Sequence, residues 1–538
     1  MLSYARGRER PLLEETVFTA FAKTVERYPD ADALIVPFQD VRLSFRALAG
    51  EVERVAGALL GLGLNPGDRF GVWATNCAEW LYLQLAAARV GLILVNVNPA
   101  NRASEMAHVL KRSGMRAIFL HGRDERCDYR RILEEVRASN PDLGLSAAVY
   151  FASSSWDEFL AASRPVGAIR VSPDEVTNMQ YTSGTTGLPK GVLLTHRNVV
   201  NNGRFVAESL KMSAGDRIVA PVPMYHCFGC VGGTMPMVTS GAALILPAAT
   251  FDPLATMRAI ESWRGTVIYG VPTMFIAQLD HPEFRQRDFG SLRTGLMAGA
   301  PCPIEVMRRV VTDMHCPQMS IVYGQTESSP VITGSDVDAP LEIRVATVGV
   351  PYPNTEVKIV DPAGTTVPVG EQGELCTRGY LVMRGYDGEP EATSRAIDPH
   401  GWLHTGDLAT MRPDGTFLIT GRVKDMIIRG GENVYPREIE EFFYTHAKVS
   451  DIQVVGVPDA RLGEAVAAWI RLKPGAHATE DELREFCRGR IAHFKEPKYI
   501  RLVEEFPMTV TGKVQKFRIR QIEIDLRGLS GLSGTETA

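Results

Sequence analysis

The sequence predicts an α/β protein with a large N-terminal domain of parallel sheets covered by helices, a small β-rich subdomain and a small α+β domain at the C-terminal end. Between about residues 31 and 420, short β-branched or aliphatic runs alternate with helix-like stretches, as in RFGVWAT, GLILVNV and QMSIVYG. After Gly349 the strands become shorter and Gly and Pro punctuate them, as in NTEVKIVDPAGTTV. The last part of the chain reads strand, strand, helix, strand (DIQVVGV, AVAAWIRL, EDELREFC, YIRLVEEF).

The length of 538 residues exceeds what one hydrophobic core usually supports, so we expect more than one domain. We assign residues 1–423 to the large domain, with the β-rich part at about 349–420, and residues 424–525 to the small one. The boundary lies near Lys424 because the charged turn GRVKD leads through paired glycines into a helix that should open with Pro436. Residues 526–538 are rich in Gly and Ser, which predicts a flexible tail.

Composition excludes several classes of protein. The net charge is -5, with 58 basic against 63 acidic residues. The chain therefore lacks the excess of positive charge that is typical of proteins that bind nucleic acid, or that bind a membrane through a polybasic surface. The most apolar run, Leu81 to Val97, is interrupted by Gln84, Arg89 and Gly91, so we expect no integral membrane association. The N-terminus has no apolar signal-like region and the 8 Cys are scattered, which favours the cytoplasm.

One short pattern suggests metal or redox chemistry. His226 precedes Cys227-Phe-Gly-Cys230, and a CxxC beside His can bind zinc. No second CxxC completes a site, and buried Cys is common packing material. We therefore predict no zinc.

The stretch YTSGTTGLPKGV, residues 181–192, has the composition of a phosphate-binding loop. Gly brings backbone N–H groups close to a ligand, while hydroxyls and a Lys add donors and positive charge. It is not a Walker A loop, because no Gly directly precedes Lys190 and no Ser or Thr follows it. An ordinary surface turn is the alternative. The candidate phosphate-binding residues are Thr182, Ser183, Gly184, Thr185, Thr186, Gly187 and Lys190.

Four further motifs follow in order: YGQTES at 323–328, TGD at 405–407, GRVKD at 421–425 and TGKVQK at 511–516. With the loop, they make the chain resemble the adenylate-forming superfamily of acyl-CoA synthetases, aryl-CoA ligases, nonribosomal adenylation domains and beetle luciferases. Within it, PMYHCFGCVGGTM, YGVPTMF and HFKEPKYI are most similar to medium-chain acyl-CoA synthetases of the family-member-2 type. The resemblance implies that a carboxylate attacks the α-phosphate of ATP to give acyl-AMP and pyrophosphate, after which a thiol displaces AMP.

The resemblance also implies catalytic roles. Lys513 would contact the substrate carboxylate and the α-phosphate, where positive charge stabilises the transition state. Glu327 would hold Mg²⁺ with help from Thr185, because hard cations prefer oxygen ligands. His226 matches a family His near the reacting carboxylate, and a structural role is the alternative for it. An exposed loop Lys is the alternative for Lys513.

The nucleotide site is implied in the same way. Tyr323 would stack on adenine and Thr326 would bind the AMP phosphate, while Asp407 would accept from the ribose hydroxyls with help from Arg422. A core Tyr and an exposed turn Asp are the ordinary alternatives. The remaining members of the predicted site are Gly299, Ala300, Pro301 and Gly324.

The C-terminal domain of the family is mobile and swings about a hinge that matches Lys424. In the second pose Gly430 and Gly431 would approach the pantetheine arm of CoA. Many relatives carry a Lys where this chain has Ile428, followed by Arg429, so Arg429 is our candidate for CoA binding.

The predicted acyl pocket is apolar. Amino-acid adenylation domains tend to carry an Asp in this region, which this chain lacks, and Cys230 replaces the Trp that gates the tunnel of several long-chain synthetases. Apolar side chains with a neighbouring Gly suggest a slot for hydrocarbon, so medium-chain acids are favoured. Its expected residues are His226, Phe228, Val231, Gly232, Val271, Met274 and Val331.

The expected function is therefore ATP-dependent synthesis of acyl-CoA, with ATP, Mg²⁺ and CoA as cofactor and co-substrates and a second copy of the chain as a candidate partner. The alternatives are an aryl or other specialised acid-CoA ligase and an acyl-AMP ligase that loads a carrier protein. A nonenzymatic AMP or acyl sensor would be expected to lack Lys513 or Glu327, and both are present.

Overall fold

The computed structural model describes residues 1–125, 127–182, 189–300, 302–430, 432–509 and 514–529. The chain forms two compact units, described separately below. The larger unit comprises Ala5–Val357 and Cys376–His404, and the smaller one Met1–Tyr4, Lys358–Leu375 and Thr405–Ala538. The domain boundaries expected from the sequence stay predictions.

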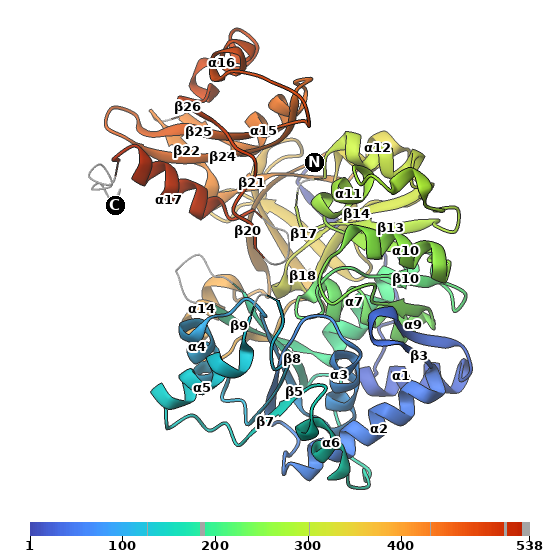
Figure 1. Cartoon of the computed structure of the whole chain (residues 1–538). Helices are drawn as coiled ribbons and strands as arrows, with labels where there is room; N and C mark the ends of the chain where they lie inside the picture. The colour runs from blue at the N-terminus through green and yellow to red at the C-terminus, as the bar shows by residue number, and fades with distance from the viewer. Residues whose placement is uncertain (126, 183–188, 301, 431, 510–513, 530–538) are drawn as a thin grey trace. The chain divides into compact units, whose positions relative to one another are not determined.

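The first sheet of the larger unit has seven strands in the order β19-β9-β8-β5-β4-β6-β7. The five strands from β8 to β7 are parallel, and β9 and β19 are antiparallel additions at one edge. Helices α2, α3 and α6 cover one face and α4 and α5 the other (Figure 1). The strands are β4 (Arg69–Trp73), β5 (Ile93–Val97), β6 (Ala117–Leu120), β7 (Ala147–Tyr150), β8 (Val176–Thr182), β9 (Lys190–Thr195) and β19 (Gly385–Tyr386). The helices are α2 (Phe45–Gly61), α3 (Ala78–Val90), α4 (Ala103–Ser113), α5 (Tyr129–Ser139) and α6 (Ser154–Ala161).

The second sheet has nine strands in the order β16-β15-β14-β13-β12-β10-β11-β2-β3. Its six central members, β2 to β14, are parallel, and the edge strands β3, β15 and β16 are antiparallel. The strands are β2 (Asp32–Val36), β3 (Val41–Ser44), β10 (Arg217–Val219), β11 (Ala243–Ile245), β12 (Val267–Gly270), β13 (Thr294–Met297), β14 (Gln318–Gly324), β15 (Val331–Gly334) and β16 (Val350–Pro351).

The helices associated with this sheet begin and end at residues that suit those positions. Thr16 caps α1 through a reciprocal pair with Thr19, and Asp252 caps α10, whose first residue is Pro253. Helices α10, α11 and α12 cover one face (Figure 1). The helices are α1 (Val17–Arg27), α7 (His196–Ser209), α8 (Cys227–Cys230), α9 (Thr234–Ser240), α10 (Pro253–Trp263), α11 (Pro272–Leu279), α12 (Ile304–Thr312) and α13 (Leu341–Ala346), with short 3₁₀ turns η1 (Pro37–Gln39), η2 (Phe284–Gln286) and η3 (Thr326–Ser328). Helix α14 (Pro390–Ala396) contacts β19 of the first sheet.

Alternate residues of the central strands enter different cores. In β12, Val267 and Tyr269 enter the same core as Phe70 and Val72 of β4, whereas Ile268 points into a second core beneath α10 and α11. Both faces of the parallel strands are therefore buried, which explains why these segments read as nearly continuous apolar runs. The predicted α/β class, with parallel sheets covered by helices, is confirmed.

The short strands expected after Gly349 are present. They are β16 and β19, given above, with β17 (Thr355–Val360), β18 (Gln372–Gly379), β20 (Leu403–Met411) and β21 (Phe417–Arg422). The N-terminal strand β1 (Tyr4–Arg6) joins the sheet order β1-β17-β18-β20-β21. Strands β20 and β21 form an antiparallel pair that places Asp407 opposite Arg422.

The C-terminal part of the smaller unit has the predicted strand, strand, helix, strand order. Its sheet follows the order β23-β22-β25-β24, with β26 paired to β25, and α15 opens with Pro436 as expected. Val454 of β24 and Ile439 of α15 share one core, and Val455 and Ile519 share another. The elements are η4 (Val423–Asp425), β22 (Ile427–Arg429), β23 (Glu432–Val434), α15 (Pro436–Tyr444), β24 (Val449–Asp459), β25 (Gly463–Leu472), α16 (Glu480–Cys487), η5 (His493–Lys495), β26 (Tyr499–Leu502) and α17 (Lys516–Leu526).

None of the helices that the structure describes combines the length and the apolar character needed to cross a membrane.

Candidate active site

The two ends of the predicted phosphate loop lie side by side. Thr182 is the last residue of β8, Lys190 is the first residue of β9, and the two are paired in the antiparallel register. The loop therefore emerges at the end of a strand pair in the larger unit, as loops that hold ligands do in α/β sheets. The other candidates in it, Ser183, Gly184, Thr185, Thr186 and Gly187, lie outside the described residues.

Glu327 is the point where three distant segments meet. It lies in η3, directly after β14, and its backbone oxygen accepts from Met383 N at 2.9 Å. The hydroxyls of Thr182 and Tyr386 both donate to its Oε1, at 3.3 and 3.0 Å. Burial and the neighbouring carboxylate raise the pKa of Tyr386 well above its usual range, so this hydroxyl stays protonated. The Glu327 side chain is thereby held beside the phosphate-loop strands.

Tyr386 also contacts the basic residue of the loop. The ammonium of Lys190 lies 5.0 Å from the centroid of the Tyr386 ring, within the range of a cation–π contact. The sequence prediction missed this tyrosine. The tripeptide Arg-Gly-Tyr occurs at both 378–380 and 384–386, and nothing local distinguishes Tyr386 from Tyr380.

The predicted adenine and phosphate contacts follow neighbouring parallel strands. Tyr323 lies near the end of β14, and Gly299 and Ala300 follow β13, so the topology brings both segments to the same edge of the sheet. A Cβ at Gly324 would lie 1.8 Å from the Pro330 carbonyl oxygen, which requires glycine there. Pro301 lies outside the described residues.

The segment expected to line the acyl pocket contacts the nucleotide motif. His226 caps α8, where its Nδ1 accepts from Phe228 N at 3.1 Å, which leaves the proton of a neutral ring on Nε2. The next residue, Cys227, places its Sγ 3.6 Å from the hydroxyl of the buried Thr326. The predicted acyl and AMP-phosphate residues therefore adjoin each other.

The apolar members of the predicted pocket belong to one buried cluster of the larger unit. The ring of Phe228 stacks on that of Tyr269, with centroids 5.7 Å apart, and sequence reasoning missed Tyr269 as well. A Cβ at Gly232 would lie 2.7 Å from the Phe228 carbonyl oxygen, which explains the glycine. The clustered residues are Phe228, Val231, Val271, Met274 and Val331.

The smaller unit holds the predicted ribose and hinge residues. Arg422 donates to the buried carboxylate of Asp407 at 3.0 Å across the β20–β21 pair. Burial, followed by repulsion from Arg422, lowers the pKa of Lys424. Arg429 donates to the carbonyl oxygens of Phe494 and Glu496, at 2.8 and 2.9 Å. Gly430 has a left-handed φ of 63°, while Gly431 and Lys513 lie outside the described residues.

Comparison with known families explains why these motifs occur together. Residues 21–387 match the AMP-binding enzyme family, and residues 438–513 match the AMP-binding enzyme C-terminal domain. The chain belongs to the AMP-binding enzyme family. This membership confirms the predicted resemblance to adenylate-forming enzymes.

Individual members of the AMP-binding enzyme family are similar over nearly the whole chain. YngI of Bacillus subtilis (strain 168) is 44% identical over 545 residues, which cover 96% of this chain and 99% of YngI. The mitochondrial medium-chain acyl-CoA ligase ACSF2 of Homo sapiens is 41% identical over 554 residues, covering 97% of this chain and 89% of ACSF2. The fold is similar to that of ATP-bound MatB from Rhodopseudomonas palustris, with a TM-score of 0.85, 27% identity and coverage of 95% and 100% of the two chains.

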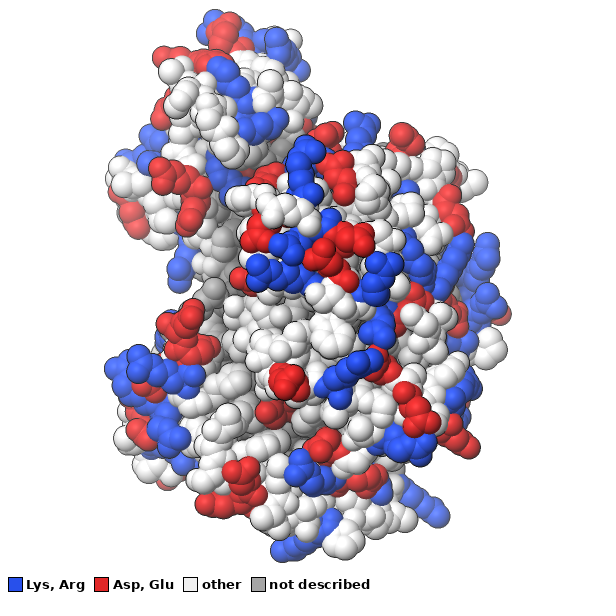
Figure 2. Space-filling model, turned by 45° about the vertical axis from the view of Figure 1, so that its right-hand side comes forward, with Lys and Arg blue, Asp and Glu red and all other residues white. Residues whose placement is uncertain are grey.

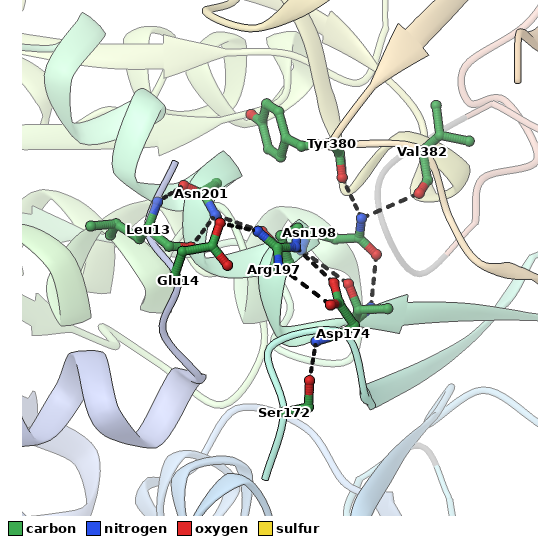
Figure 3. Close-up of polar contacts among 10 residues, drawn as sticks. Leu13, Glu14, Ser172, Asp174, Arg197, Asn198, Asn201, Tyr380 and Val382 are labelled. Carbon is green, nitrogen blue, oxygen red and sulfur yellow. Dashed lines mark hydrogen bonds and ion pairs between the residues drawn. The ribbon is translucent and has the colours of Figure 1, made fainter. Parts of the chain in front are cut away.

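A hollow of about 480 Å³ lies elsewhere on the larger unit of this AMP-binding enzyme, beside the start of α7. Figure 3 shows that its side chains hold neighbouring segments to this helix: Asn198 donates to the carbonyl oxygens of Tyr380 and Val382, and Arg197 pairs with Asp174 and Glu14. The hollow is lined by Ser172, Asp174, Glu175, Thr195, Arg197, Asn198, Val382 and Arg384. These contacts anchor the segment that continues to Met383 and Tyr386.

The charged side chains on the face shown in Figure 2 are of both signs and interspersed. Many charged side chains of the described residues form ion pairs, such as Arg217 and Arg42 with Asp32, and Arg293 with Asp216.

Proposed function

We propose that this protein is an AMP-forming acid-CoA ligase that activates a medium-chain fatty acid. In the first step the carboxylate attacks the α-phosphate of ATP, giving acyl-AMP and pyrophosphate. In the second step the thiol of CoA attacks the acyl carbon and AMP leaves. The observation that carries the proposal is the 3.6 Å contact between Cys227, beside the apolar cluster, and Thr326 of the nucleotide motif. An acid bound against that cluster would place its carboxylate next to the phosphate.

The larger unit supplies residues suited to the first step. Lys190 brings positive charge to the end of the phosphate-loop strand pair, and Glu327 supplies carboxylate oxygens, which are the ligands that Mg²⁺ prefers. Because two hydroxyls fix Oε1 of Glu327, the carboxylate has a defined orientation for a cation. When bound, the ion would neutralise phosphate charge. We assign the corresponding contact with the α-phosphate and the substrate carboxylate to Lys513.

The acid would bind against the apolar cluster of the larger unit. The cluster around Val271 and Met274 is apolar and buried, which suits an alkyl chain, and ACSF2 is named as a medium-chain ligase. An aryl acid is the second candidate, because the stacked pair of Phe228 and Tyr269 offers aromatic faces on which a ring could pack. CoA would approach through Gly430 and Gly431, with Arg429 at the neighbouring strand.

A product analysis tests the proposal. The purified protein is incubated with ATP, Mg²⁺, CoA and an equimolar mixture of short, medium, long and aryl acids, and the products are identified by mass spectrometry. We expect one dominant medium-chain acyl-CoA, together with AMP and pyrophosphate. A dominant aryl-CoA would replace the alkyl substrate with the second candidate. Acyl-AMP and pyrophosphate without any thioester would replace CoA with another acceptor, and no turnover of any acid would refute the ligase.

A further inference from the structure

Tyr386 lies on a two-residue strand that is fastened to the strand carrying Lys190. In β19, Tyr386 pairs with Val192 and Gly385 pairs with Leu193 of β9. The pairing extends on both sides, because Arg384 N donates to Leu193 O at 2.9 Å and Asp387 N donates to Gly191 O at 2.8 Å. The tyrosine is therefore held in register with the end of the phosphate loop.

A salt bridge also holds the segment that carries Tyr386 in place. Asp387 accepts two hydrogen bonds from the Arg69 guanidinium, at 2.7 and 2.9 Å, and Arg69 also donates to the Ser113 carbonyl oxygen at 2.8 Å. The Tyr386 backbone N–H donates to the Thr393 hydroxyl at 2.9 Å. Paired guanidinium–carboxylate bonds of this kind restrict geometry more strongly than a single contact. The backbone that carries the phenol ring is therefore constrained both by its pairing with β9 and by these hydrogen bonds.

The side chain connects two groups that have no bond to each other among the described residues. Its hydroxyl donates to Glu327 Oε1 at 3.0 Å, and its ring lies 5.0 Å from the Lys190 ammonium. Thr182 donates to the same Oε1, and within the described residues the second carboxylate oxygen, Oε2, accepts no hydrogen bond. Two neutral donors on one oxygen orient the carboxylate and leave the other oxygen for a cation.

We propose that Tyr386 is a positioning residue of the adenylation site, which orients Glu327 toward the Mg²⁺ of MgATP with its hydroxyl and holds Lys190 toward the triphosphate with its ring. The inference rests on the proposed function, since it assumes that the site takes MgATP. It assigns separate tasks to the two parts of one side chain, and these tasks can be tested separately.

The chain itself offers a matched control. Tyr380 occurs in the same tripeptide, Arg-Gly-Tyr, but its ring packs on Phe205 and its hydroxyl lies 3.5 Å from the Asn202 amide nitrogen. Removing that hydroxyl changes a tyrosine in the same neighbourhood without touching Glu327 or Lys190. Tyr380→Phe therefore measures what the loss of a buried tyrosine hydroxyl does by itself.

The experiment is a calorimetric titration of ATP into the full-length wild type and the variants Tyr386→Phe, Tyr386→Leu and Tyr380→Phe. Each protein is titrated once with Mg²⁺ and once with a chelator. Neither acid nor CoA is present. For Tyr386→Phe we expect ATP affinity with Mg²⁺ to fall about tenfold, because a hydrogen bond to a charged group is lost, and Mg²⁺-free affinity to remain nearly unchanged. For Tyr386→Leu, Mg²⁺-free affinity should also fall, by about threefold, because Lys190 loses its aromatic contact. Tyr380→Phe should match wild type in both titrations, and melting temperatures would show that every variant is folded.

The proposal would be overturned if Tyr386→Phe bound ATP with wild-type affinity. It would also be overturned if Tyr380→Phe lost as much ATP affinity as Tyr386→Phe, since the effect would then be general to buried tyrosine hydroxyls. The titrations distinguish a failure of this inference from a failure of the ligase assignment. If wild type binds ATP with the expected Mg²⁺ response but makes no thioester, the role of Tyr386 stands and the proposed function fails. If wild type binds no ATP, both fail.

Discussion

Thr182 and Glu327 are separated by 145 positions in the chain, and the hydroxyl of Thr182 donates to the Glu327 carboxylate at 3.3 Å. This bond connects the strand before the phosphate loop with the turn after β14. Both belong to the larger unit, so the proposed site of the first half-reaction has a defined framework there.

Replacement of Glu327 by Gln should impair the Mg²⁺-dependent step. The amide keeps the size of the side chain but removes the negative charge that a cation requires, so we expect kcat/KM for adenylation to fall roughly 100-fold and the Mg²⁺ requirement to rise. Pyrophosphate release measured over a Mg²⁺ series tests this. Glu371→Gln, at an exposed position, is the control. An unchanged Mg²⁺ requirement in Glu327→Gln would refute the role.

Lys513→Ala should separate the two half-reactions. A cation that stabilises the charge developing at the α-phosphate is needed for adenylation, so that rate should fall by about 100- to 1,000-fold, while thiolysis of added acyl-AMP by CoA changes far less. The half-reactions are measured with ATP plus acid and with synthetic acyl-AMP plus CoA. Lys473→Ala, an exposed lysine, serves as the control. Equal losses in both half-reactions would contradict the assignment.

Met274→Ala should shift the preference for chain length. Met274 is only 4% exposed and belongs to the apolar cluster with Phe228 and Val271, so its truncation should lengthen the slot and favour longer acids by about tenfold in kcat/KM. Met257→Ala creates a similar cavity in a different core and should not change the preference. Both variants should lose about 2–5 kcal/mol of unfolding free energy. Acid competition assays measure the chain-length preference of each variant. The pocket role of Met274 would be ruled out if neither variant changed the preference, or if Met257→Ala changed it as much as Met274→Ala.

His196 should make stability depend on pH. Burial lowers the pKa of His196 from 6.5 to about 3, and its Nδ1 accepts from Val17 N at 3.2 Å in the neutral form. Between these two pKa values the unfolded chain binds a proton that the folded chain does not, so the free energy of unfolding falls as the pH is lowered through this range. Above pH 6.5 the ring is neutral in both states, so its titration no longer changes the free energy of unfolding.

Urea denaturation between pH 7.5 and 4.5 measures this effect. Below pH 6.5 the loss of unfolding free energy should be steeper in wild type than in His196→Gln, by up to about 1.4 kcal/mol per pH unit. His493→Gln, whose side chain is 91% exposed, should retain the wild-type slope. Identical slopes in wild type and His196→Gln would show that this histidine does not control acid stability.

Much of the candidate site could be predicted from local patterns. Thr182, Lys190 and Glu327 stand in short motifs, because contact with phosphate and metal restricts the residue types near one loop or turn. The family match confirms the prediction of an adenylate-forming enzyme. The cytoplasmic location, the homodimer and the roles of individual residues stay predictions.

Tyr386 and Tyr269 could not be predicted in the same way. The first acquires its contacts because β19 pairs with β9, nearly 200 positions earlier in the chain, and the second because α8 packs its Phe228 against β12. Register between distant segments depends on how whole elements pack, and a residue's neighbours in sequence do not report it.

Local patterns in the sequence were enough to predict the α/β class, the order of the motifs and the residue types of the candidate nucleotide site, since hydrophobic periodicity and the requirements of phosphate binding are local properties of the chain. The packing of distant segments determines that Oε1 of Glu327 accepts from both Thr182 and Tyr386, and that one tyrosine of two identical tripeptides contacts Lys190. Those contacts depend on long-range strand pairing and on the burial of side chains, which arise only when the elements pack together.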